Sequence, residues 1–458
     1  MALIKTISGF RGTIGGSPKS NLTPVDIVGC TAAFGQWILS RDVPKKVIIG
    51  RDGRISGELV SALASNTLRA LGIDVVDLGL STTPTVEVMV PKLEAGAGII
   101  FTASHNPKEW NALKFLNDKG EFISGEIGKE ILALEAKNEF EFAPVDKMGS
   151  YSTYENAIAE HIDLILALEY LDIENIRNRK FHVVVDCINS TGAISIPPLL
   201  DKLGCTYELI NGEVNGDFAH NPEPLPAHLV DLCEKVGSSS ADLGIVVDPD
   251  VDRLAFVSDN GIFFGEENTL VAVADFVLSK KKGNTVSNLS STRALSDITN
   301  KHGGTYAASA VGEVNVVNKM KETNAVIGGE GNGGVILPDL HYGRDALVGI
   351  ALFLNLLSER GITCSELQKE YPKYEIRKHK IQLNDKMDLE NIFSKLKAKY
   401  AEERINTIDG LKIDMENGWV HLRKSNTEPI LRVYSESSSA EEADQLAEMI
   451  INDVKSLS

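Results

Sequence analysis

The sequence is poor in cysteine, in long apolar runs and in positive charge, and each shortage excludes a class of protein. Its five cysteines are scattered, odd in number and never spaced as CxxC, so neither a disulfide framework nor a zinc site is indicated, and we expect reduced, buried thiols. No stretch approaches the roughly 20 apolar residues of a membrane span, and the first ten residues lack the apolar run of a signal peptide. We therefore expect a cytoplasmic protein that does not bind membranes.

Acidic residues outnumber basic ones, because 46 Lys and Arg stand against 64 Asp and Glu, and the net charge is −18. Such a balance argues against nonspecific binding to nucleic acid or to an anionic membrane. An anionic ligand must then meet positive charge that is concentrated locally. Places where Arg and Lys cluster beside glycine are therefore the first candidates for a site.

The composition is that of an ordinary globular protein, with 43% hydrophobic and 24% charged residues. Short β-branched runs end in polar or glycine-rich motifs and lead into helix-like stretches; residues 47–50, for example, lead into Asp52. This pattern is typical of α/β units with function at strand C-termini. Helical periodicity covers residues 154–170 and 267–279, and residues 346–357 are apolar enough for a largely buried helix.

At roughly 150 residues per domain, the length indicates about three or four domains. The last part differs from the rest, because its strands alternate and a helical segment follows over residues 440–454, which favours an α+β unit. The predicted fold is therefore α/β, with three similar domains of mixed sheets and a C-terminal α+β domain. Polar stretches suggest boundaries that give residues 1–150, 151–257, 258–370 and 371–458.

The first polar motif is TASHNP at residues 102–107, which follows a strand rich in Ile and Phe. Pro107 biases Asn106 away from the helical region, so a sharp loop displays Ser104. A serine that is phosphorylated and held beside a divalent cation is a reusable phosphoryl donor. On local evidence a turn or capping serine with an incidental histidine, His105, remains the alternative.

The second motif, DPDVDR at residues 248–253, follows an apolar run and alternates Asp248, Asp250 and Asp252. In an alternating strand these carboxylates share a face, and a hard divalent cation such as Mg²⁺ would neutralise their repulsion. An EF-hand loop does not fit, because Arg253 stands where the turn glycine is needed. A solvated cluster of charges is the remaining alternative.

The third motif, GEGNGG at residues 329–334, formally matches the dinucleotide-binding pattern GxGxxG. Residues 335–338 continue as an extended segment, so no helix N-terminus would receive a pyrophosphate. The loop is better suited to present Glu330 and Asn332 to sugar hydroxyls, because the glycines allow close approach. A plain glycine turn remains the alternative.

The fourth motif, RKSNTEPILR at residues 423–432, lies between two predicted strands and combines two arginines with hydroxyl and amide donors. Guanidinium groups and short donors can satisfy a phosphate dianion, so the segment is a candidate phosphate-binding loop. A surface turn with incidental arginines is the alternative.

Taken together and in this order, the four motifs resemble the α-D-phosphohexomutase family. Weaker agreements occur at residues 10–13, 111–114, 220–224 and 341–345. The resemblance implies four domains around a central active-site cleft, each of which contributes one loop. It also implies a C-terminal lid whose closure protects the phosphoserine from water.

The resemblance implies a role for each motif. Ser104 is similar to the phosphoserine, whose oxygen would complete a Mg²⁺ site formed by Asp248, Asp250 and Asp252. Arg253 would steady the phosphoryl group. The positions near the transferred phosphate, where proton transfer and charge stabilisation are needed, correspond to Arg11, His105 and Lys114. Glu330 and Asn332 would hold sugar hydroxyls. The phosphate that is not transferred would be held by Arg423, Ser425, Asn426, Thr427 and Arg432.

The implied substrate is a hexose or hexosamine phosphate, and the implied reaction passes through a sugar 1,6-bisphosphate. The leading hypothesis is a phosphoglucosamine mutase that interconverts glucosamine 6-phosphate and glucosamine 1-phosphate, acting as a monomer or homodimer. The GNGG loop resembles archaeal-type members of both substrate classes, so a phosphomannomutase/phosphoglucomutase is the close alternative. Two other classes stay open: a metal-dependent sugar phosphatase with Asp248 as nucleophile, and a non-catalytic sugar-phosphate sensor.

Overall fold

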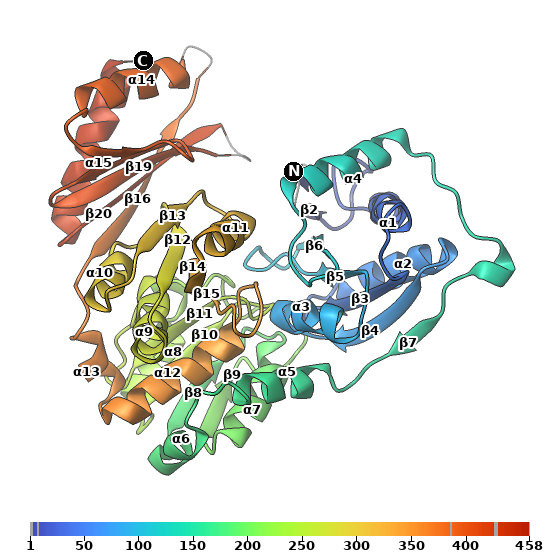
Figure 1. Ribbon diagram of the computed structural model, residues 1–458, viewed down its shortest axis with the longest axis horizontal. Coiled ribbons are helices and arrows are strands. Elements are labelled where there is room, and N and C mark those ends of the chain that lie inside the picture. The colour runs from blue at the N-terminus through green and yellow to red at the C-terminus, as the bar shows by residue number, and fades with distance from the viewer. Residues whose placement is uncertain (1–2, 7–8, 385–386, 426–428, 458) are drawn as a thin grey trace.

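The computed structural model describes residues 3–6, 9–384, 387–425 and 429–457. The chain forms four sheets in succession, and the first and last units lie on either side of the middle pair (Figure 1). None of the helices described has the length and apolar composition needed to cross a membrane. The predicted fold class, three α/β units with mixed sheets followed by an α+β unit, is confirmed.

The first unit is a seven-stranded mixed sheet in the order β1-β2-β6-β5-β3-β4-β7. Its strands are β1 (Ile4–Thr6), β2 (Gly9–Thr13), β3 (Lys46–Arg51), β4 (Asp74–Leu80), β5 (Ala97–Phe101), β6 (Trp110–Leu116) and β7 (Tyr151–Thr153). Its helices are α1 (Pro24–Leu39), α2 (Gly57–Ala70), α3 (Thr83–Lys92) and α4 (Gly125–Lys137), followed by the short helix η1 (Val145–Lys147). Strand β7 lies in the range assigned to the second domain but pairs in parallel with β4, so it belongs to the first sheet.

The second unit has the strand order β11-β10-β8-β9. Its elements are α5 (Ala157–Leu166), α6 (Ile173–Arg179), β8 (His182–Asp186), α7 (Gly192–Lys202), β9 (Thr206–Ile210), η2 (Pro226–His228), α8 (Val230–Gly237), β10 (Leu243–Val247) and β11 (Leu254–Ser258). The helix expected over 154–170 ends at Leu166, because a turn follows and Asp172 caps the N-terminus of α6 through the backbone N–H of Asn175.

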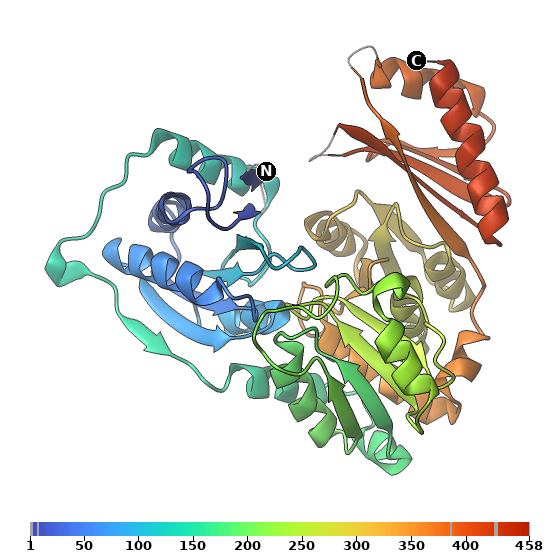
Figure 2. The same ribbon diagram turned by 180° about the vertical axis from the view of Figure 1, so that it is seen from behind.

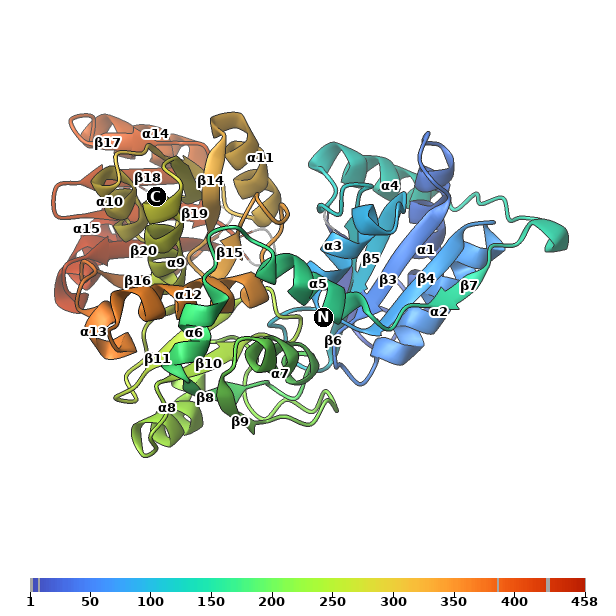
Figure 3. The same cartoon turned by 60° about the horizontal axis from the view of Figure 1, so that its bottom comes forward.

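The third unit has the strand order β13-β12-β14-β15. Its elements are α9 (Glu266–Lys280), β12 (Asn284–Asn288), α10 (Ala294–Lys301), β13 (Tyr306–Ser309), α11 (Glu313–Thr323), β14 (Ala325–Glu330), β15 (Gly334–Ile336), α12 (Ala346–Arg360) and α13 (Cys364–Gln368). Helix α12 confirms the predicted buried helix, since it packs against α9 of its own unit and against α5, α6 and α7 of the second (Figure 3). The second and third units therefore share one hydrophobic core.

The fourth unit is an antiparallel sheet in the order β16-β20-β19-β18-β17. Its elements are β16 (Glu375–Gln382), α14 (Leu389–Lys399), β17 (Arg404–Asn406), β18 (Leu411–Met415), β19 (Gly418–Lys424), β20 (Ile430–Ser437) and α15 (Ala440–Ser456). Helix α15 packs on the sheet beside β16, β19 and β20 (Figure 2). This is the α+β arrangement expected from the alternating strands.

An aromatic stack joins the second and third units inside their shared core. The ring of Phe353 on α12 stacks on Phe256 of β11 with centroids 3.8 Å apart, and Phe264 meets Phe353 edge-on at 5.3 Å. All three side chains are almost completely buried. We expect Phe353→Ala to lower the free energy of unfolding by about 3–5 kcal/mol, because it leaves a cavity that the core cannot fill. Urea unfolding measures the effect. Val25→Ala, at a position that is 69% exposed, is the control, and an equal loss in both variants would contradict the shared core.

Candidate active site

Loops from all four units meet at one cavity of about 280 Å³. Each unit contributes at least one lining residue: His105 from the first, Arg253 from the second, Glu330 from the third and Arg423 from the fourth. Three of the loops begin where β5, β10 and β14 end, which is the edge of an α/β sheet where ligands commonly bind. The structure therefore brings the four sequence motifs together.

Ser104 is held in an unusual backbone conformation at this junction. Its φ of 49° lies in the left-handed region, which a non-glycine residue adopts only when its surroundings enforce it. Its backbone N–H donates to Thr102 Oγ1 at 2.9 Å, and its hydroxyl donates to Asp248 Oδ2 at 2.6 Å. The side chain is 4% exposed. The serine hydroxyl is thus aimed at the aspartate motif of the second unit.

Arg54 shapes the serine loop (residues 102–107), although none of the four sequence motifs includes it. Its guanidinium is buried and donates to the carbonyl oxygens of Ser104, Asn106, Pro107 and Trp110 at 2.5–2.9 Å. Asp52 binds the same guanidinium at 3.0 Å and also accepts from Thr102 Oγ1 at 2.6 Å. The available signal was Asp52 itself, a polar residue directly after a buried strand, with an arginine two positions later.

The three aspartates form a compact, buried set of carboxylates. Asp248, Asp250 and Asp252 are 0% exposed, and each offers an oxygen within 4.8 Å of the others. Oδ1 of Asp250 and Oδ1 of Asp252 are buried without a hydrogen-bond partner among the described residues. Buried polar atoms are rarely left unsatisfied, and an all-oxygen donor set suits a hard divalent cation. The residues present therefore fit a metal site.

Burial and mutual repulsion raise the pKa of Asp248 well above its ordinary value, with Asp252 and Asp250 as the repelling neighbours. Burial alone would raise the pKa of Asp250 too, but Lys114 and Thr83 lower it below its ordinary value. Lys114 Nζ lies 2.9 Å from Asp250 Oδ2, and Thr83 Oγ1 donates to the same oxygen at 2.7 Å. The first unit thus supplies both groups that keep Asp250 ionised.

Three side chains expected near the transferred phosphate lie at the serine and aspartate loops. Arg253 Nε is buried without a hydrogen-bond partner among the described residues and lies 4.0 Å from Asp248 Oδ2. Arg11 Nη1 donates to Asn106 Oδ1 at 3.0 Å, and His105 Nδ1 lies 3.4 Å from Ser104 Oγ. Burial, followed by the nearby charges of Arg253 and Arg11, lowers the pKa of His105 to about 2. The imidazole is therefore neutral in a region of positive potential that suits a dianion.

Arg344 links the aspartate loop (residues 248–253) to the glycine-rich loop at residues 329–334, the candidate sugar loop. No role was predicted for this arginine either. Its three guanidinium nitrogens donate to three carboxylates, Asp252 at 2.6 Å, Glu330 at 3.0 Å and Glu313 at 3.1 Å. The side chain is 9% exposed. Residues 341–345 agree weakly with the family in sequence, but only the fold shows that this segment, which lies between β15 and α12 in the chain, reaches Asp252 and Glu330.

The sugar loop lines the cavity as expected. Glu330 Oε1 accepts from Asn288 Nδ2 at 2.9 Å and from the Gly312 N–H at 3.1 Å, and Oε2 accepts from Arg344 and from Asn332 Nδ2. Four protein donors thus hold this carboxylate in place. The loop continues into strand β15 and not into a helix, as the argument against a dinucleotide site required.

The phosphate loop is only partly described. Arg423 and Arg432 line the cavity, and the Ser425 N–H donates to the Ile430 carbonyl at 3.0 Å. Arg423 Nε lies 3.0 Å from Asp409 Oδ2, which also accepts from the Val311 N–H of the third unit at 3.0 Å. The predicted ligands Asn426 and Thr427 lie outside the described residues.

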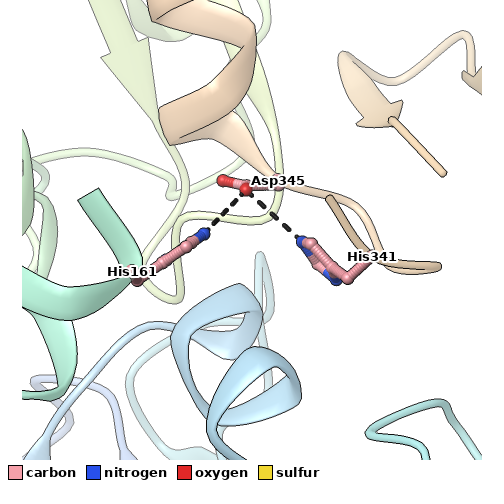
Figure 4. Close-up of side chains that lie close together, drawn as sticks. All are labelled: His161, His341 and Asp345. Carbon is pink, nitrogen blue, oxygen red and sulfur yellow. Dashed lines mark hydrogen bonds and ion pairs between the residues drawn. The ribbon is translucent and has the colours of Figure 1, made fainter. Parts of the chain in front are cut away.

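A buried network behind the aspartate loop ties three units together. Figure 4 shows His161 of α5 and His341 both directed at Asp345, with Nε2 to Oδ2 distances of 3.0 and 3.4 Å. Helix α3 completes the network, since Thr85 Oγ1 lies 3.0 Å from His161 Nδ1 and Glu87 Oε2 lies 3.4 Å from His341 Nδ1.

The helices that this network joins also hold the aspartate loop. At the start of α3 the N–H of Thr83 donates to the Asp250 carbonyl at 2.9 Å. At the start of α12 the N–H of Ala346 donates to the Val251 carbonyl at 3.2 Å. The network therefore fixes the loop from two sides.

Four units of this type and order are the architecture of phosphohexomutases. The chain belongs to the phosphoglucomutase/phosphomannomutase family: its alpha/beta/alpha domains I, II and III match residues 3–142, 159–261 and 266–374, and its C-terminal domain matches residues 379–453. The family predicted from the sequence is confirmed.

Similar proteins carry two kinds of name. A phosphoglucomutase/phosphomannomutase of Thermococcus kodakarensis is 35% identical over 96% of each chain. A phosphoglucosamine/phosphogalactosamine mutase of Sulfurisphaera tokodaii is 31% identical over 98% of this chain and 97% of the relative. The crystal structure of a phosphoglucomutase/phosphomannomutase family protein from Burkholderia thailandensis, 27% identical, covers 100% of this chain and 98% of its own with a TM-score of 0.87.

Arg344→Met tests the link between the aspartate and sugar loops. We expect a loss of about 3–5 kcal/mol in the free energy of unfolding, because three buried carboxylates lose their shared cation. We also expect mutase kcat/KM to fall more than about tenfold, since Asp252 and Glu330 are displaced. Arg344→Lys should recover only part of both, because an ammonium cannot bridge three carboxylates in a fork.

The control is Lys321→Met, which removes an exposed ion pair to Glu121 and should cost less than about 1 kcal/mol. If Arg344→Met lowered the free energy of unfolding no more than this control does, the ion pairs of Arg344 would not contribute to stability.

Proposed function

We propose that the protein is a phosphohexomutase that moves phosphate between the 1- and 6-positions of a hexosamine phosphate through a phosphorylated Ser104. The observation that carries the proposal is the 2.6 Å hydrogen bond from Ser104 Oγ to Asp248, across the boundary between the first and second units. It joins a strained, buried hydroxyl to a set of carboxylates suited to a divalent cation.

In this proposal Asp248, Asp250, Asp252 and a phosphoserine oxygen hold Mg²⁺, which supplies charge stabilisation to the phosphoryl group during transfer. Arg253 stabilises the same negative charge through its available Nε donor. Arg11 and Lys114 add positive charge on the side of the first unit.

The first transfer forms a bond between phosphorus and a sugar oxygen and breaks the bond to Ser104 Oγ. The proton of the sugar hydroxyl is transferred to Ser104 Oγ. Arg11, His105 and Lys114 are the groups proposed to move it, and His105 Nδ1 lies 3.4 Å from that oxygen. The resulting sugar 1,6-bisphosphate turns over in the cavity, and its other phosphate returns to Ser104 in the reverse chemistry.

The far end of the cavity is suited to hold the phosphate that is not being transferred. Arg423 and Arg432 supply guanidinium groups there, and Ser425, Asn426 and Thr427 belong to the same proposed loop. Two-ended recognition of this kind permits either phosphate to occupy either place. We also propose that the enzyme is cytoplasmic and acts as a monomer or homodimer.

Glucosamine phosphate is the leading substrate. Relatives named probable phosphoglucosamine mutases, such as one from Methanopyrus kandleri that is 33% identical over 98% of this chain, favour it. The Thermococcus relative named a phosphoglucomutase/phosphomannomutase keeps glucose and mannose phosphates as the second candidates.

Ser104→Ala should abolish interconversion of hexose phosphates, because no other group takes up the phosphoryl moiety. Intact-mass measurement after incubation with a sugar 1,6-bisphosphate should show one phosphoryl group on the wild type and none on the variant. Ser238→Ala, at an exposed position, is the control and should keep both properties. Turnover near the wild-type rate in the Ser104 variant would rule out the serine mechanism. Retained release of inorganic phosphate would favour a phosphatase that uses Asp248.

A side-by-side assay with Mg²⁺ and a catalytic amount of sugar 1,6-bisphosphate should rank the substrates. We expect kcat/KM for glucosamine phosphate to exceed the values for glucose and mannose phosphates by at least about tenfold, which corresponds to roughly 1.4 kcal/mol of transition-state preference. The reverse ranking would make the enzyme a phosphomannomutase/phosphoglucomutase with an unchanged mechanism.

A further inference from the structure

Four glutamates line the active-site cavity, and they are not equivalent. Three of them have a cation within 4.0 Å: Glu223 has Arg253 at 3.6 Å, Glu266 has Lys378 at 4.0 Å and Glu330 has Arg344 at 3.0 Å. Glu267, the fourth, has no Lys, Arg or His nitrogen within 4.0 Å among the described residues.

Glu267 also has unused hydrogen-bonding capacity. It stands in the first turn of α9, where Oε2 accepts from the Thr292 N–H at 2.8 Å. Its Oε1 has no hydrogen bond to the described part of the chain. By contrast, four protein donors already occupy Glu330, which leaves that carboxylate little capacity for a further donor. Glu267 therefore combines free capacity to accept a hydrogen bond with the lack of a cation within 4.0 Å among the described residues.

The sugar loop leaves room for this carboxylate. A Cβ placed on Gly331 would come within 2.1 Å of both carboxylate oxygens of Glu267, so only glycine at this position permits the approach. Gly331 stands between Glu330 and Asn332, the residues expected to hold sugar hydroxyls. Glu267 therefore lies beside the part of the cavity assigned to the sugar ring.

The surroundings of Glu267 are unfavourable to an unpaired negative charge. Burial raises the pKa of its carboxyl well above the ordinary range, and the negative charges of Glu266 and Glu436 add to the effect. The bond from Thr292 and the more distant Lys378 lower the pKa by less. A carboxylate in such a place gains most when a ligand brings the missing positive charge.

We infer that Glu267 binds the ammonium group of an amino sugar phosphate and so distinguishes hexosamine from neutral hexose phosphates. The inference rests on the proposed mutase function and specifies its substrate class. An ammonium has three donors, one of which satisfies Oε1, and it also neutralises the carboxylate. A hydroxyl at the same place can donate one hydrogen bond but leaves the charge uncompensated.

Glu267→Gln tests the inference, because it keeps the size of the side chain and removes the charge. The measurement is the ratio of kcat/KM for glucosamine 6-phosphate to that for glucose 6-phosphate. We expect this ratio to fall at least about tenfold, as is usual when a charge-assisted hydrogen bond becomes a neutral one. Glu266→Gln is the matched control: it is one residue away in the same cavity, has its own cation, and should leave the ratio within about twofold.

A second variant does not alter the carboxylate itself. Gly331→Ala should displace Glu267 and lower the same ratio, and it remains informative if Glu267→Gln fails to fold. Binding of glucosamine 6-phosphate and glucose 6-phosphate to the Ser104→Ala protein, measured by calorimetry, gives the preference without turnover. We expect the amino sugar to bind at least about tenfold more tightly.

The outcomes separate this inference from the proposed function. A wild-type enzyme that converts no hexose phosphate would overturn the mutase proposal. An active enzyme with no preference for the amino sugar would overturn the hexosamine assignment and the role of Glu267, but not the mutase mechanism. A Glu267→Gln variant that lowers both kcat/KM values equally would overturn only the role of Glu267.

Discussion

The repulsion among Asp248, Asp250 and Asp252 is the constraint on which much of the structure depends. Three carboxylates within 4.8 Å of one another in a dry loop are tolerated only if cations and donors meet them there. Each neighbouring unit supplies some: Lys114, Thr83 and Ser104 come from the first and Arg344 from the third. The interaction that prepares a metal site is therefore also the interaction that holds the units in register.

Compensation of charge continues outward from this loop, and it explains how a protein of net charge −18 can gather positive charge around His105. Arg344 is neutralised by three carboxylates and adds little net charge to the cavity. Arg253 and Arg11 keep donors or charge directed at the position of Ser104, where burial and these cations hold His105 neutral. The electrostatic potential at this site therefore depends on the cations that are only partly paired, and not on the overall composition of the chain.

The sequence predicted the fold class, the four motifs and the buried helix α12, because strand ends and apolar periodicity are local signals. It could not predict Arg54, because its four carbonyl partners lie 50–56 residues further along the chain. Nor could it predict the network of His161, Asp345 and α3, because these contacts join different units. Glu267 was read only as part of an amphipathic helix. It differs from the other cavity glutamates because no described Lys, Arg or His nitrogen lies within 4.0 Å of it, which is a property of the assembled cavity. The boundary predicted at residue 151 put β7 in the second domain, but β7 pairs with β4 of the first sheet. A polar junction does not reveal which sheet the next strand joins.

The fourth unit is attached in a different way from the other three. Every described hydrogen bond and ion pair between it and the rest goes to the third unit, including Arg293 to Asp414 at 2.6 Å and Lys412 to the Leu289 carbonyl at 2.8 Å. Arg423 is held by Asp409, which itself accepts from the third unit, so this interface orients one of the residues proposed to bind phosphate. In the proposed mechanism a bisphosphate turns over, which needs space at one end of the cavity while the end at the aspartates stays fixed. The buried charges where the first three units meet keep the aspartate end fixed. The fourth unit, attached through one polar interface, is the part of the chain that can make space at the other end.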